Sequence, residues 1–531
     1  MNLSGRRFSE FKARVIAVLA VGAALSAAVG SSAAADARAG RPNVLVIVAD
    51  DLGFGDLGCY GATRVKTPHV DRLAAGGVRF TAGYAPASTC TPTRYALFTG
   101  EYAWRQTAKR TGILAGDAPL CIEPGRLTLP QSLKNAGYAT GAIGKWHLGL
   151  GDGRVPVDFN GRIAPGPREI GFDYCHIIPA TVDRVPTVWI ENDRVVGLDP
   201  ADPIAVSYQR DFGTEPNGID RPDLLKQPAD KQHSGTIING ISRIGFMQGG
   251  KAARFKDEEL PTTIVNKSVA FLEAHRDRPF FLYVGLFEPH VPRVAQAPFV
   301  GSSELGVRGD VIHQMDWQTG EILKALERLH LAEDTLVIFT SDNGPVLFDG
   351  YRDRSQEDVK DHRPAGGLRG WKYLVYEGGC RVPLIARWPA RIKARVSDQM
   401  FSLVDVFATV AKVAGSELTA ASSPDSIDLS PVLLGQTAEN LRDHTVLHGI
   451  SDVLALRAGD WKYIPAAGGA NAAGSGGGAN LADPRFAESR NGSGQLFNLR
   501  TDPAERSNVI KDFPEKAEEL RQKLQGIRSR N

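Results

Sequence analysis

Four short runs of apolar, mostly β-branched residues limit most strongly how this chain of 531 residues can fold. They are Asn43–Ala49, Ala139–Ile143, Phe280–Leu286 and Leu336–Thr340. Continuous apolar runs of this length are typical of strands that are buried on both faces of a parallel sheet. Helical spacing over Glu259–His275 and Val311–Leu329 lies between the later runs. The sequence therefore predicts an α/β fold with a central, mostly parallel sheet sandwiched by helices.

The pattern changes near residue 444. Short strand candidates follow at Val453–Arg457 and Trp461–Ile464, then a low-complexity insertion at Ala466–Ala482 and a charged helix at Pro514–Ser529. This arrangement indicates a small C-terminal α+β subdomain with an antiparallel sheet. We expect one large domain over residues 36–443 and the subdomain over residues 444–531.

The first 35 residues are typical of a secretory signal peptide. A basic start is followed by an apolar run from Val15 to Val29 and by small residues up to Ala35. The apolar run has fifteen residues, whereas a membrane anchor needs about 20. We expect cleavage near Ala35, a periplasmic or secreted protein, and no membrane association after the signal is removed.

The charge balance excludes a general binder of polyanions. Lys and Arg total 62 against 60 Asp and Glu, which gives a formal net charge of +2. Removing the first 35 residues, which carry four basic and one acidic side chain, changes this charge to −1. Any anion-handling charge must then be local, and no nucleic-acid partner is expected.

Five cysteines in so long a chain exclude a disulfide-built scaffold, and their odd number leaves at least one thiol unpaired. Four of them have no metal-ligand spacing, namely Cys59, Cys121, Cys175 and Cys380. Two alternatives remain open for these four: buried thiols, or up to two disulfides in an oxidising compartment.

Polar side chains follow each of the four apolar runs. In chain order they are Asp50 and Asp51, then Lys145 and His147, then His290, and finally Asp342 and Asn343. Ligands of open α/β sheets bind beyond the carboxyl ends of the strands, so we expect these side chains to share one site. Any one of them taken alone would more simply be a helix cap or a loop residue.

The residue types in this set indicate ester chemistry. Hard oxygen ligands suit Ca²⁺ or Mg²⁺, and they are Asp50, Asp51, Asp342 and Asn343. Cationic or titratable groups accompany them at Lys145, His147, His290 and Lys372. A metal ion with cations and histidines can polarise a tetrahedral oxyanion ester and protonate its leaving group. The predicted reaction is therefore transfer or hydrolysis of a phosphate or sulfate ester.

The segment Cys90–Arg94 reads Cys-Thr-Pro-Thr-Arg and runs into Leu97-Phe98-Thr99-Gly100. It resembles the Cys-x-Pro-x-Arg signature of the type I sulfatases, in the alkaline-phosphatase superfamily, which leads into Leu-x-Thr-Gly. Further segments resemble that family in the same order, namely Asp50–Gly53, Gly144–Gly149, Pro289–Pro292, Ser341–Gly344, Leu368–Lys372 and Gln495–Leu499. The resemblance spans nearly the whole chain after the signal peptide.

The resemblance implies two cofactors. One is a single Ca²⁺ ion whose ligands would be Asp50, Asp51, Asp342, Asn343 and an oxygen of the modified Cys90. The other is formylglycine, which a formylglycine-generating enzyme would form from Cys90 while the chain is unfolded. One hydroxyl of its hydrate would attack sulfur, and the other would later collapse to the aldehyde and expel sulfate.

The family roles transfer to the remaining site residues. Arg94 and Lys145 would hold the nucleophile and neutralise developing charge, and Lys372 would clamp a sulfate oxygen. His290 would protonate the leaving alcohol, and His147 would assist collapse of the sulfated intermediate. Two alternatives stay open: Cys90 as an unmodified buried thiol, and His147 as a structural histidine. The other candidate histidines are expected to be structural, and these are His176, His233, His313, His362, His444 and His448.

The substrate is expected to be a sulfated carbohydrate. An exposed pair, Asp183 and Arg184, would grip sugar hydroxyls while Trp189 stacks on the ring; the alternative is an ordinary surface ion pair. Residues 191–196 and 239–245 resemble secreted bacterial arylsulfatase A-like enzymes of the N-acetylgalactosamine-6-sulfatase type. That resemblance implies removal of sulfate from galactose or N-acetylgalactosamine, at the 6-position.

Two other functions remain as alternatives. The first is a phosphodiester or phosphonate monoester hydrolase of the same superfamily, which would use a similar site. The second is a non-catalytic binder of sulfated glycans, which would follow if Cys90 is never oxidised.

Overall fold

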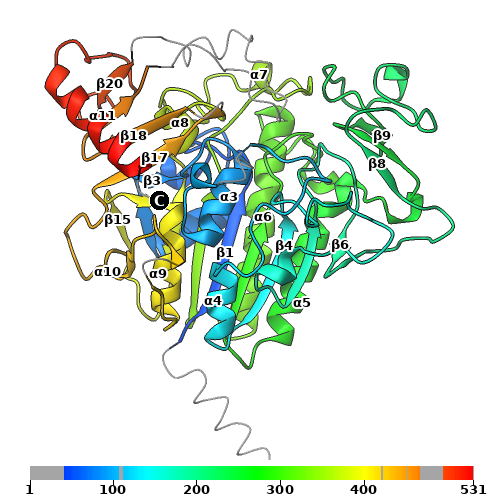
Figure 1. The fold of residues 1–531 in the computed structure, drawn as a ribbon, viewed down its shortest axis with the longest axis horizontal. Helices are drawn as coiled ribbons and strands as arrows, with labels where there is room; N and C mark the ends of the chain where they lie inside the picture. The colour runs from blue at the N-terminus through cyan, green and yellow to red at the C-terminus, as the bar shows by residue number, and fades with distance from the viewer. Residues whose placement is uncertain (1–40, 107–111, 420–421, 451–452, 467–493, 530–531) are drawn as a thin grey trace, which may run out of the picture.

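The computed structural model describes residues 41–106, 112–419, 422–450, 453–466 and 494–529 (Figure 1). The expected signal peptide and nearly all of the expected low-complexity insertion lie outside these residues. Among the helices in the described ranges, none has both the length and the apolar character that a bilayer crossing requires.

The centre of the molecule is a ten-stranded sheet with the strand order β15-β2-β14-β13-β1-β12-β4-β5-β6-β7. Its core is parallel and consists of β13 (Thr335–Ser341), β1 (Asn43–Ala49), β12 (Phe280–Gly285), β4 (Ala139–Lys145) and β5 (Tyr174–Ile178). All four apolar runs are strands of this core, which confirms the predicted parallel sheet. The fifth strand, β5, had no apolar run to reveal it because it reads Tyr-Cys-His-Ile-Ile.

Shorter strands extend the sheet on both sides. On one side are β14 (Leu384–Arg387), β2 (Val78–Phe80) and β15 (Arg395–Ser397), and on the other are β6 (Ile190–Glu191) and β7 (Arg194–Val195). Antiparallel pairing occurs between β13 and β14, β14 and β2, β5 and β6, and β6 and β7. The sheet is therefore mixed at its margins and parallel where the site residues leave it.

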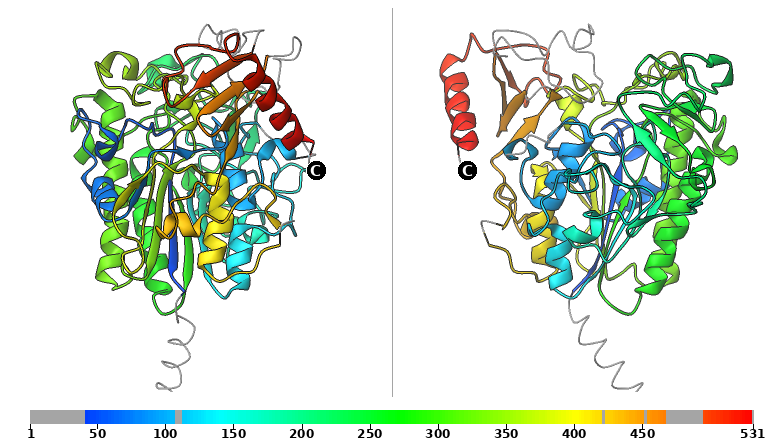
Figure 2. Two further views of the ribbon diagram at one scale, coloured as in Figure 1. Left: turned by 90° about the vertical axis from the view of Figure 1, so that its left-hand side faces the viewer. Right: turned by 45° about the vertical axis from the view of Figure 1, so that its right-hand side comes forward.

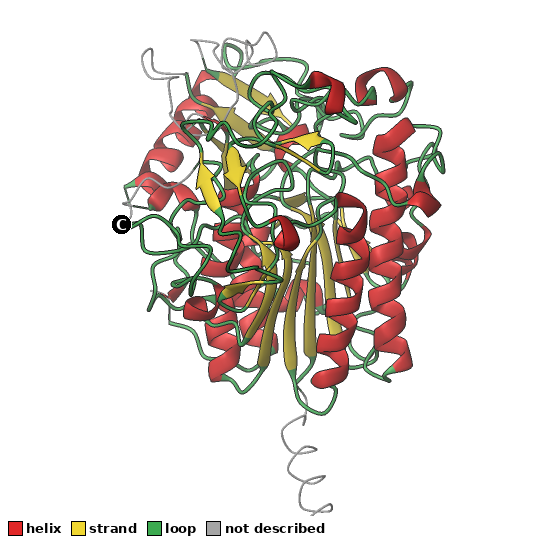
Figure 3. Ribbon diagram, turned by 90° about the vertical axis from the view of Figure 1, so that its right-hand side faces the viewer, coloured by secondary structure: helices red, strands yellow, loops and turns green. Residues whose placement is uncertain are grey.

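Helices cover both faces of the sheet (Figures 1 and 3). On one face, Leu45 and Ile47 pack with α2 (Pro68–Ala75), α5 (Leu260–Ala274) and α6 (Gly306–Arg328). On the other, Val44 and Val46 pack with α3 (Cys90–Thr99), α4 (Leu129–Asn135) and α9 (Val406–Val413). Successive side chains of a strand point to opposite faces, so β1 supplies both cores at once.

The long stretch between β4 and α5 folds into small elements. Two-stranded sheets form from β8 (Ala205–Ser207) with β11 (Phe246–Gln248) and from β9 (Ile237–Ile238) with β10 (Ile241–Ser242).

Other small elements are spread along the chain. A further two-stranded sheet pairs β3 (Gly83–Tyr84) with β16 (Phe401–Ser402). Short α-helices are α7 (Ser355–Asp358), α8 (Glu377–Cys380) and α10 (Ser430–Leu433). Single 3₁₀ turns occur at Gly58–Tyr60, Ala103–Arg105, Pro167–Ile170, Pro222–Leu224, Lys251–Ala253, Asp257–Glu259, Ala297–Phe299 and Leu403–Asp405.

The C-terminal part forms the separate antiparallel sheet that the sequence predicts. Its strands are β17 (His444–His448), β18 (Leu454–Ala458), β19 (Trp461–Ile464) and β20 (Gln495–Asn498). The last helix, α11 (Pro514–Arg528), packs its apolar side chains against one face of this sheet (Figure 2). The other face packs against Tyr84 and Tyr376 of the large unit.

All five cysteines have free thiols in the structure. Of the two alternatives for Cys59, Cys121, Cys175 and Cys380, the structure therefore has unpaired thiols rather than disulfides. Cys59 is partly exposed and the other three are buried.

Candidate functional site

The parallel strands β1, β4, β12 and β13 bring the expected polar residues to one edge of the sheet, the one formed by the carboxyl ends of these strands. Ala49 pairs with Ser341 in the β1–β13 register, so Asp50 and Asp342 leave neighbouring strands at the same level. Lys145 is the last residue of β4, and Lys145 Nζ lies 2.6 Å from Asp50 Oδ2 and 3.4 Å from Asp342 Oδ2. Residues that are far apart in the sequence therefore contact one another directly.

Cys90 is the first residue of α3, a helix whose ten residues are all buried. Its Sγ lies 3.2 Å from His147 Nδ1, while His147 Nε2 lies 2.9 Å from the carbonyl oxygen of Leu114. A carbonyl can only accept a hydrogen bond, so the ring proton belongs on Nε2 and Nδ1 faces residue 90 as an acceptor. Burial, with a further contribution from Lys145, lowers the pKa of His147 well below its usual value, which keeps the ring neutral.

Arg94 lies one helical turn after Cys90 and is fully buried. Its Nε donates to Asp342 Oδ2 at 2.9 Å, its Nη1 donates to the carbonyl oxygen of Lys145 at 3.2 Å, and Nη1 also contacts the hydroxyl of Tyr283. Burial by itself would raise the pKa of Asp342, but Lys145 and Arg94 outweigh it and lower that pKa to about 2. Asp342 is therefore a charged carboxylate held between two cations.

Lys372 reaches the site from the loop before α8. Its Nζ lies 2.9 Å from Asp51 Oδ2 and 2.9 Å from Asp349 Oδ2. The hydroxyl of Tyr373 donates to the same Asp349 carboxylate at 2.7 Å. Although burial opposes the charge of Lys372, Asp349 and Asp51 raise its pKa well above the usual value, so it is a permanent cation.

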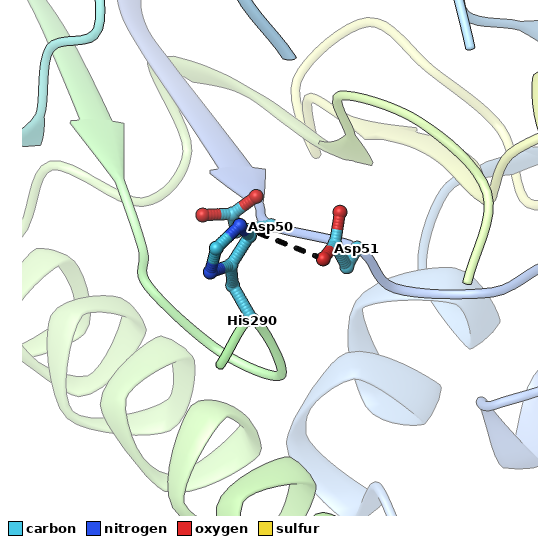
Figure 4. A group of neighbouring side chains, drawn as sticks. All are labelled: Asp50, Asp51 and His290. Atoms are coloured by element: carbon cyan, nitrogen blue, oxygen red, sulfur yellow. Dashed lines mark ion pairs between the residues drawn. The ribbon is translucent and has the colours of Figure 1, made fainter. Parts of the chain in front are cut away.

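Several buried oxygen atoms at this edge fit a divalent cation. Asp50 Oδ1 and Asn343 Oδ1 have no hydrogen-bond partner. The Asn343 amide nitrogen donates to Asp51 Oδ1 at 2.7 Å, so the Asn343 oxygen points away from that carboxylate. One ligand atom each of Asp50, Asp51 and His290 lies within 4.8 Å of the others (Figure 4). Buried oxygens without donors are costly in a protein alone and are good ligands for a hard cation such as Ca²⁺.

A pocket next to this edge brings the expected catalytic and substrate residues together. Cys90, Asp183, Arg184, His290 and Lys372 all line it. His290 Nε2 lies 3.8 Å from Asp51 Oδ2, and His290 Nδ1 lies 2.6 Å from the carbonyl oxygen of Val291. The ring therefore presents Nε2 to the site, while Nδ1 donates a hydrogen bond to the backbone carbonyl of the next residue.

Two expectations about the substrate residues were wrong. The Asp183–Arg184 pair is not an exposed surface pair: the two residues are 2% and 8% exposed, and Arg184 Nη1 donates to Asp183 Oδ2 at 2.8 Å. Trp189 does not line the pocket, because its ring stacks on His176 with the ring centroids 4.6 Å apart. A large aromatic ring packs into the core more favourably than it stays exposed.

Sequence reasoning missed three titratable side chains of the pocket: His233, Asp349 and Tyr373. His233 was expected to be structural, but its ring lies 2.8 Å from Asp230 Oδ1 through Nδ1 and 3.6 Å from Asp183 Oδ2 through Nε2. Burial lowers its pKa, yet Asp183 and Asp230 outweigh this and raise the pKa to about 9. Asp349 follows Asp342 by only seven residues, and this short separation was the one feature of the sequence that could have placed Asp349 near the site.

Comparisons with known proteins agree with this geometry. The chain matches the family described as Sulfatase over residues 42–416. It is 47% identical over 490 residues to the N-acetylgalactosamine-6-O-sulfatase of Bacteroides thetaiotaomicron, which covers 92% of this chain and 94% of that protein. It is 32% identical over 490 residues to human arylsulfatase A, which covers 90% and 85%.

A solved structure from a study of the metabolism of multiple glycosaminoglycans by Bacteroides thetaiotaomicron superimposes with a TM-score of 0.88. It is 47% identical in sequence, and the alignment covers 92% of this chain and all of that one. The resemblance to type I sulfatases that the motifs predicted is confirmed. This chain belongs to the sulfatase family and is a sulfuric ester hydrolase.

Proposed function

We propose that this protein removes sulfate from a carbohydrate, with a formylglycine at position 90 as nucleophile and one Ca²⁺ ion as cofactor. The observation that carries the proposal is the position of Cys90: it opens a buried helix, faces His147, and lines the same pocket as His290 and Lys372. A group at this position can reach a sulfate ester that enters the pocket.

Oxidation of Cys90 to formylglycine would precede the catalytic cycle, because it needs an external oxidant that the maturation enzyme would use. Hydration of the aldehyde would then give two hydroxyl groups on one carbon, and from there the cycle balances with water as the only other reactant. One hydroxyl would lose its proton as its oxygen bonds to sulfur, while the bond from sulfur to the sugar oxygen would break and that oxygen would take up a proton to leave as an alcohol. The second hydroxyl would then lose its proton, the carbon–oxygen bond to sulfate would break, and the aldehyde would be restored.

The histidine geometry supports opposite roles for the two rings. His147 presents a neutral Nδ1 acceptor to residue 90, which suits removal of the proton from the second hydroxyl. His290 presents Nε2 to the pocket while Nδ1 donates to the carbonyl oxygen of Val291, and the doubly protonated ring would give its Nε2 proton to the leaving sugar oxygen. Arg94 and Lys145 hold the carboxylates around residue 90, and Lys372 supplies a cation for a sulfate oxygen.

The ligands of the metal ion would be Asp50, Asp51, Asp342, Asn343 and an oxygen of the modified residue 90. When bound, Ca²⁺ supplies positive charge that neutralises and polarises the sulfate group. The unpartnered Asp50 Oδ1 and Asn343 Oδ1 support this assignment, since a cation would satisfy both.

The substrate class rests on the pocket and on the most similar relatives. Asp183 Oδ1 is buried without a hydrogen-bond partner and Arg184 lines the same pocket, an arrangement suited to a sugar hydroxyl. A relative that shares 47% of its sequence is named N-acetylgalactosamine-6-O-sulfatase. We therefore assign galactose or N-acetylgalactosamine 6-O-sulfate at the end of a glycan as the substrate.

Export and maturation belong to the same proposal. The protein would be secreted or periplasmic after cleavage near Ala35, with the catalytic domain over residues 36–443. A formylglycine-generating enzyme would act on Cys90 before the chain folds, because Cys90 is only 1% exposed in the folded protein. Sequencing the N-terminus of the exported protein tests the cleavage position.

The test of function compares turnover of N-acetylgalactosamine 6-sulfate, its 4-sulfate isomer, an aryl sulfate and an aryl phosphodiester by the purified holoenzyme. We expect the 6-sulfate to be the preferred sugar and sulfate release to exceed phosphodiester cleavage. Faster phosphodiester cleavage would contradict the proposal and favour the hydrolase alternative. Binding of sulfated glycan without any turnover would favour the non-catalytic one.

A further inference from the structure

The buried carboxylate of Asp56 contacts the backbone of its own loop and two other parts of the chain, through Arg308 of α6 and through His362. Its Oδ2 accepts hydrogen bonds from the backbone amide of Gly53 at 2.7 Å and from Arg308 Nη2 at 2.6 Å. Its Oδ1 accepts from Arg308 Nη1 at 2.8 Å and from His362 Nε2 at 2.8 Å. Asp56 has no exposed surface and touches no group that we assign to the reaction.

The charge of this carboxylate is secured by its partners. Burial alone would raise its pKa, but Arg308 and His362 outweigh burial and lower the pKa to about 2. Charge-assisted hydrogen bonds of this kind are stronger than neutral ones, and the bidentate arginine adds a fixed direction. Asp56 is therefore a rigid anchor rather than a mobile side chain.

The first segment that Asp56 anchors is the loop from Asp50 to Asp56, which carries the two carboxylates at the end of β1. The backbone of this loop is in the left-handed region at Asp51, whose φ is 62°. The amide of Gly55 donates to the carbonyl oxygen of Pro364 at 2.6 Å, and a Cβ at Gly53 would lie 2.1 Å from that same oxygen. The loop can approach residue 364 so closely only with glycine at position 53.

The second segment is the loop from His362 to Lys372. It begins at the side chain that donates to Asp56 and ends at the lysine that lies 2.9 Å from Asp51 Oδ2. The two loops thus meet at two places. Outside the site, His362 contacts Asp56 and the amide of Gly55 donates to Pro364, and inside the site Lys372 contacts Asp51. A shift at the first contact would move Asp51 and Lys372 relative to each other.

We propose that Asp56 is a positioning residue that sets both loops at once. Through Gly53 it orients the carboxylates of Asp50 and Asp51 toward the cation, and through His362 it places Lys372 opposite them. The part of this inference that concerns Ca²⁺ rests on the proposed function. The coupling of the two loops does not, because it concerns contacts of this chain alone.

The experiment compares Asp56→Asn with Asp405→Asn in the full-length enzyme. Asp405 is a matched control: it is also fully buried, pairs with the buried Arg442, and accepts backbone amides of Ser402 and Ile427, away from both loops. Mutation of a residue that hydrogen-bonds a metal ligand typically costs about 10–100-fold in metal affinity. Asp56 acts on the ligands through the loop backbone, so we expect the lower end of that range, about 10-fold. Calorimetric titration with Ca²⁺ should give such a weakening for Asp56→Asn and no change for Asp405→Asn, although both lose thermal stability.

A second pair of variants covers the case in which Asp56→Asn does not fold. His362→Ala removes only the contact to the second loop and should also weaken Ca²⁺ binding, whereas His362→Gln keeps a donor for Asp56 and should restore it. Hydrogen exchange supplies a readout that needs no metal. The amides of Gly53 and Gly55 and those of residues 366–372 should exchange faster in His362→Ala than in Asp405→Asn.

Two results separate the claims. If Asp56→Asn and His362→Ala leave both Ca²⁺ affinity and exchange in the two loops as in the control, the positioning role is overturned. If exchange rises in both loops while the unaltered protein binds no Ca²⁺, the loop anchor stands and the proposed cofactor is wrong.

Discussion

His233 holds its proton because two carboxylates converge on one buried imidazole ring. Its pKa of about 9 lies above the ordinary value of 6.5, with Asp183 and Asp230 as the groups that raise it. A raised folded-state pKa means that the stabilisation is fully present below about pH 6.5 and is lost as the pH rises through about 9. Asp183 Oδ2 thus lies near two cations, Arg184 Nη1 at 2.8 Å and His233 Nε2 at 3.6 Å.

We therefore predict that His233→Asn makes the unfolding free energy less dependent on pH between about pH 6.5 and 9. The unaltered protein should lose about 3 kcal/mol of unfolding free energy between pH 6.5 and 9 from this group, since one pKa unit corresponds to about 1.4 kcal/mol. Urea unfolding at several pH values measures the difference between the two proteins. Parallel pH profiles would show that folding does not raise the pKa of this ring.

Single residues also mark where sequence reasoning ended. Asp50, Asp342 and Lys145 could be assigned to one site because each follows an apolar strand, and strand ends converge in this fold. His233 could not, because it lies fifty residues after Asp183 in a stretch without periodic pattern, and only the folded loop brings them together. The burial of Asp183 and Arg184 was missed for the same reason.

At the scale of elements, β4 approaches β12 so closely that one position must be glycine. Gly144 has a φ of 92°, and a Cβ there would lie 2.0 Å from the carbonyl oxygen of Gly285 in β12. Gly137 is a matched control, because its φ is 88° but no atom lies within 4 Å of its Cβ position. Both carry the cost of a left-handed backbone, and only Gly144 adds a steric clash with neighbouring backbone.

We predict that Gly137→Ala costs about 1 kcal/mol of stability and that Gly144→Ala costs at least about 2 kcal/mol more. Gly144→Ala should also reduce sulfate release, because Lys145 is the next residue. Denaturant unfolding of both variants tests the difference. Equal losses for the two alanines would refute the idea that close strand approach demands glycine here.

The elements themselves were predictable where a strong pattern existed. The apolar runs became β1, β4, β12 and β13, and the amphipathic spacing became α5, within one residue at each end, and α6, which begins five residues earlier than expected. The antiparallel strands β14 and β2 were not anticipated, since they are three or four residues long and owe their pairing to the sheet edge. Such short strands are specified by tertiary contacts more than by local propensity.

At the scale of the whole molecule, a buried ionic cluster joins the C-terminal sheet to the large unit. Lys462 of β19 lies 3.1 Å from Glu377 Oε1 of α8 and 3.0 Å from Glu505 Oε1, and all three side chains are fully buried. The same sheet contacts the site segments through backbone, since the amide of Ser88 donates to the carbonyl oxygen of His448 at 2.8 Å. The C-terminal sheet therefore supports the segment that leads into Cys90.

Lys462→Met should leave two buried carboxylates with a weakened set of partners. We predict a loss of about 3–5 kcal/mol of unfolding free energy, as is typical when one partner of a buried ion pair is removed. The exposed pair of Lys516 and Glu519 on α11 supplies the control, and Lys516→Met should cost less than about 1 kcal/mol. Calorimetry compares the melting temperatures of the Lys462→Met and Lys516→Met proteins. Similar values would mean that the buried cluster contributes little to the stability of the contact between the C-terminal sheet and the large unit.

The central claim is that residue 90 acts as formylglycine and not as a thiol. Mass spectrometry of the peptide that contains position 90, from protein that releases sulfate and was purified from its native host, tests this most directly. We predict an aldehyde or its hydrate at position 90, with turnover proportional to the modified fraction and absent in folded Cys90→Ala protein. An unmodified Cys90 thiol throughout a preparation with full turnover would contradict the account.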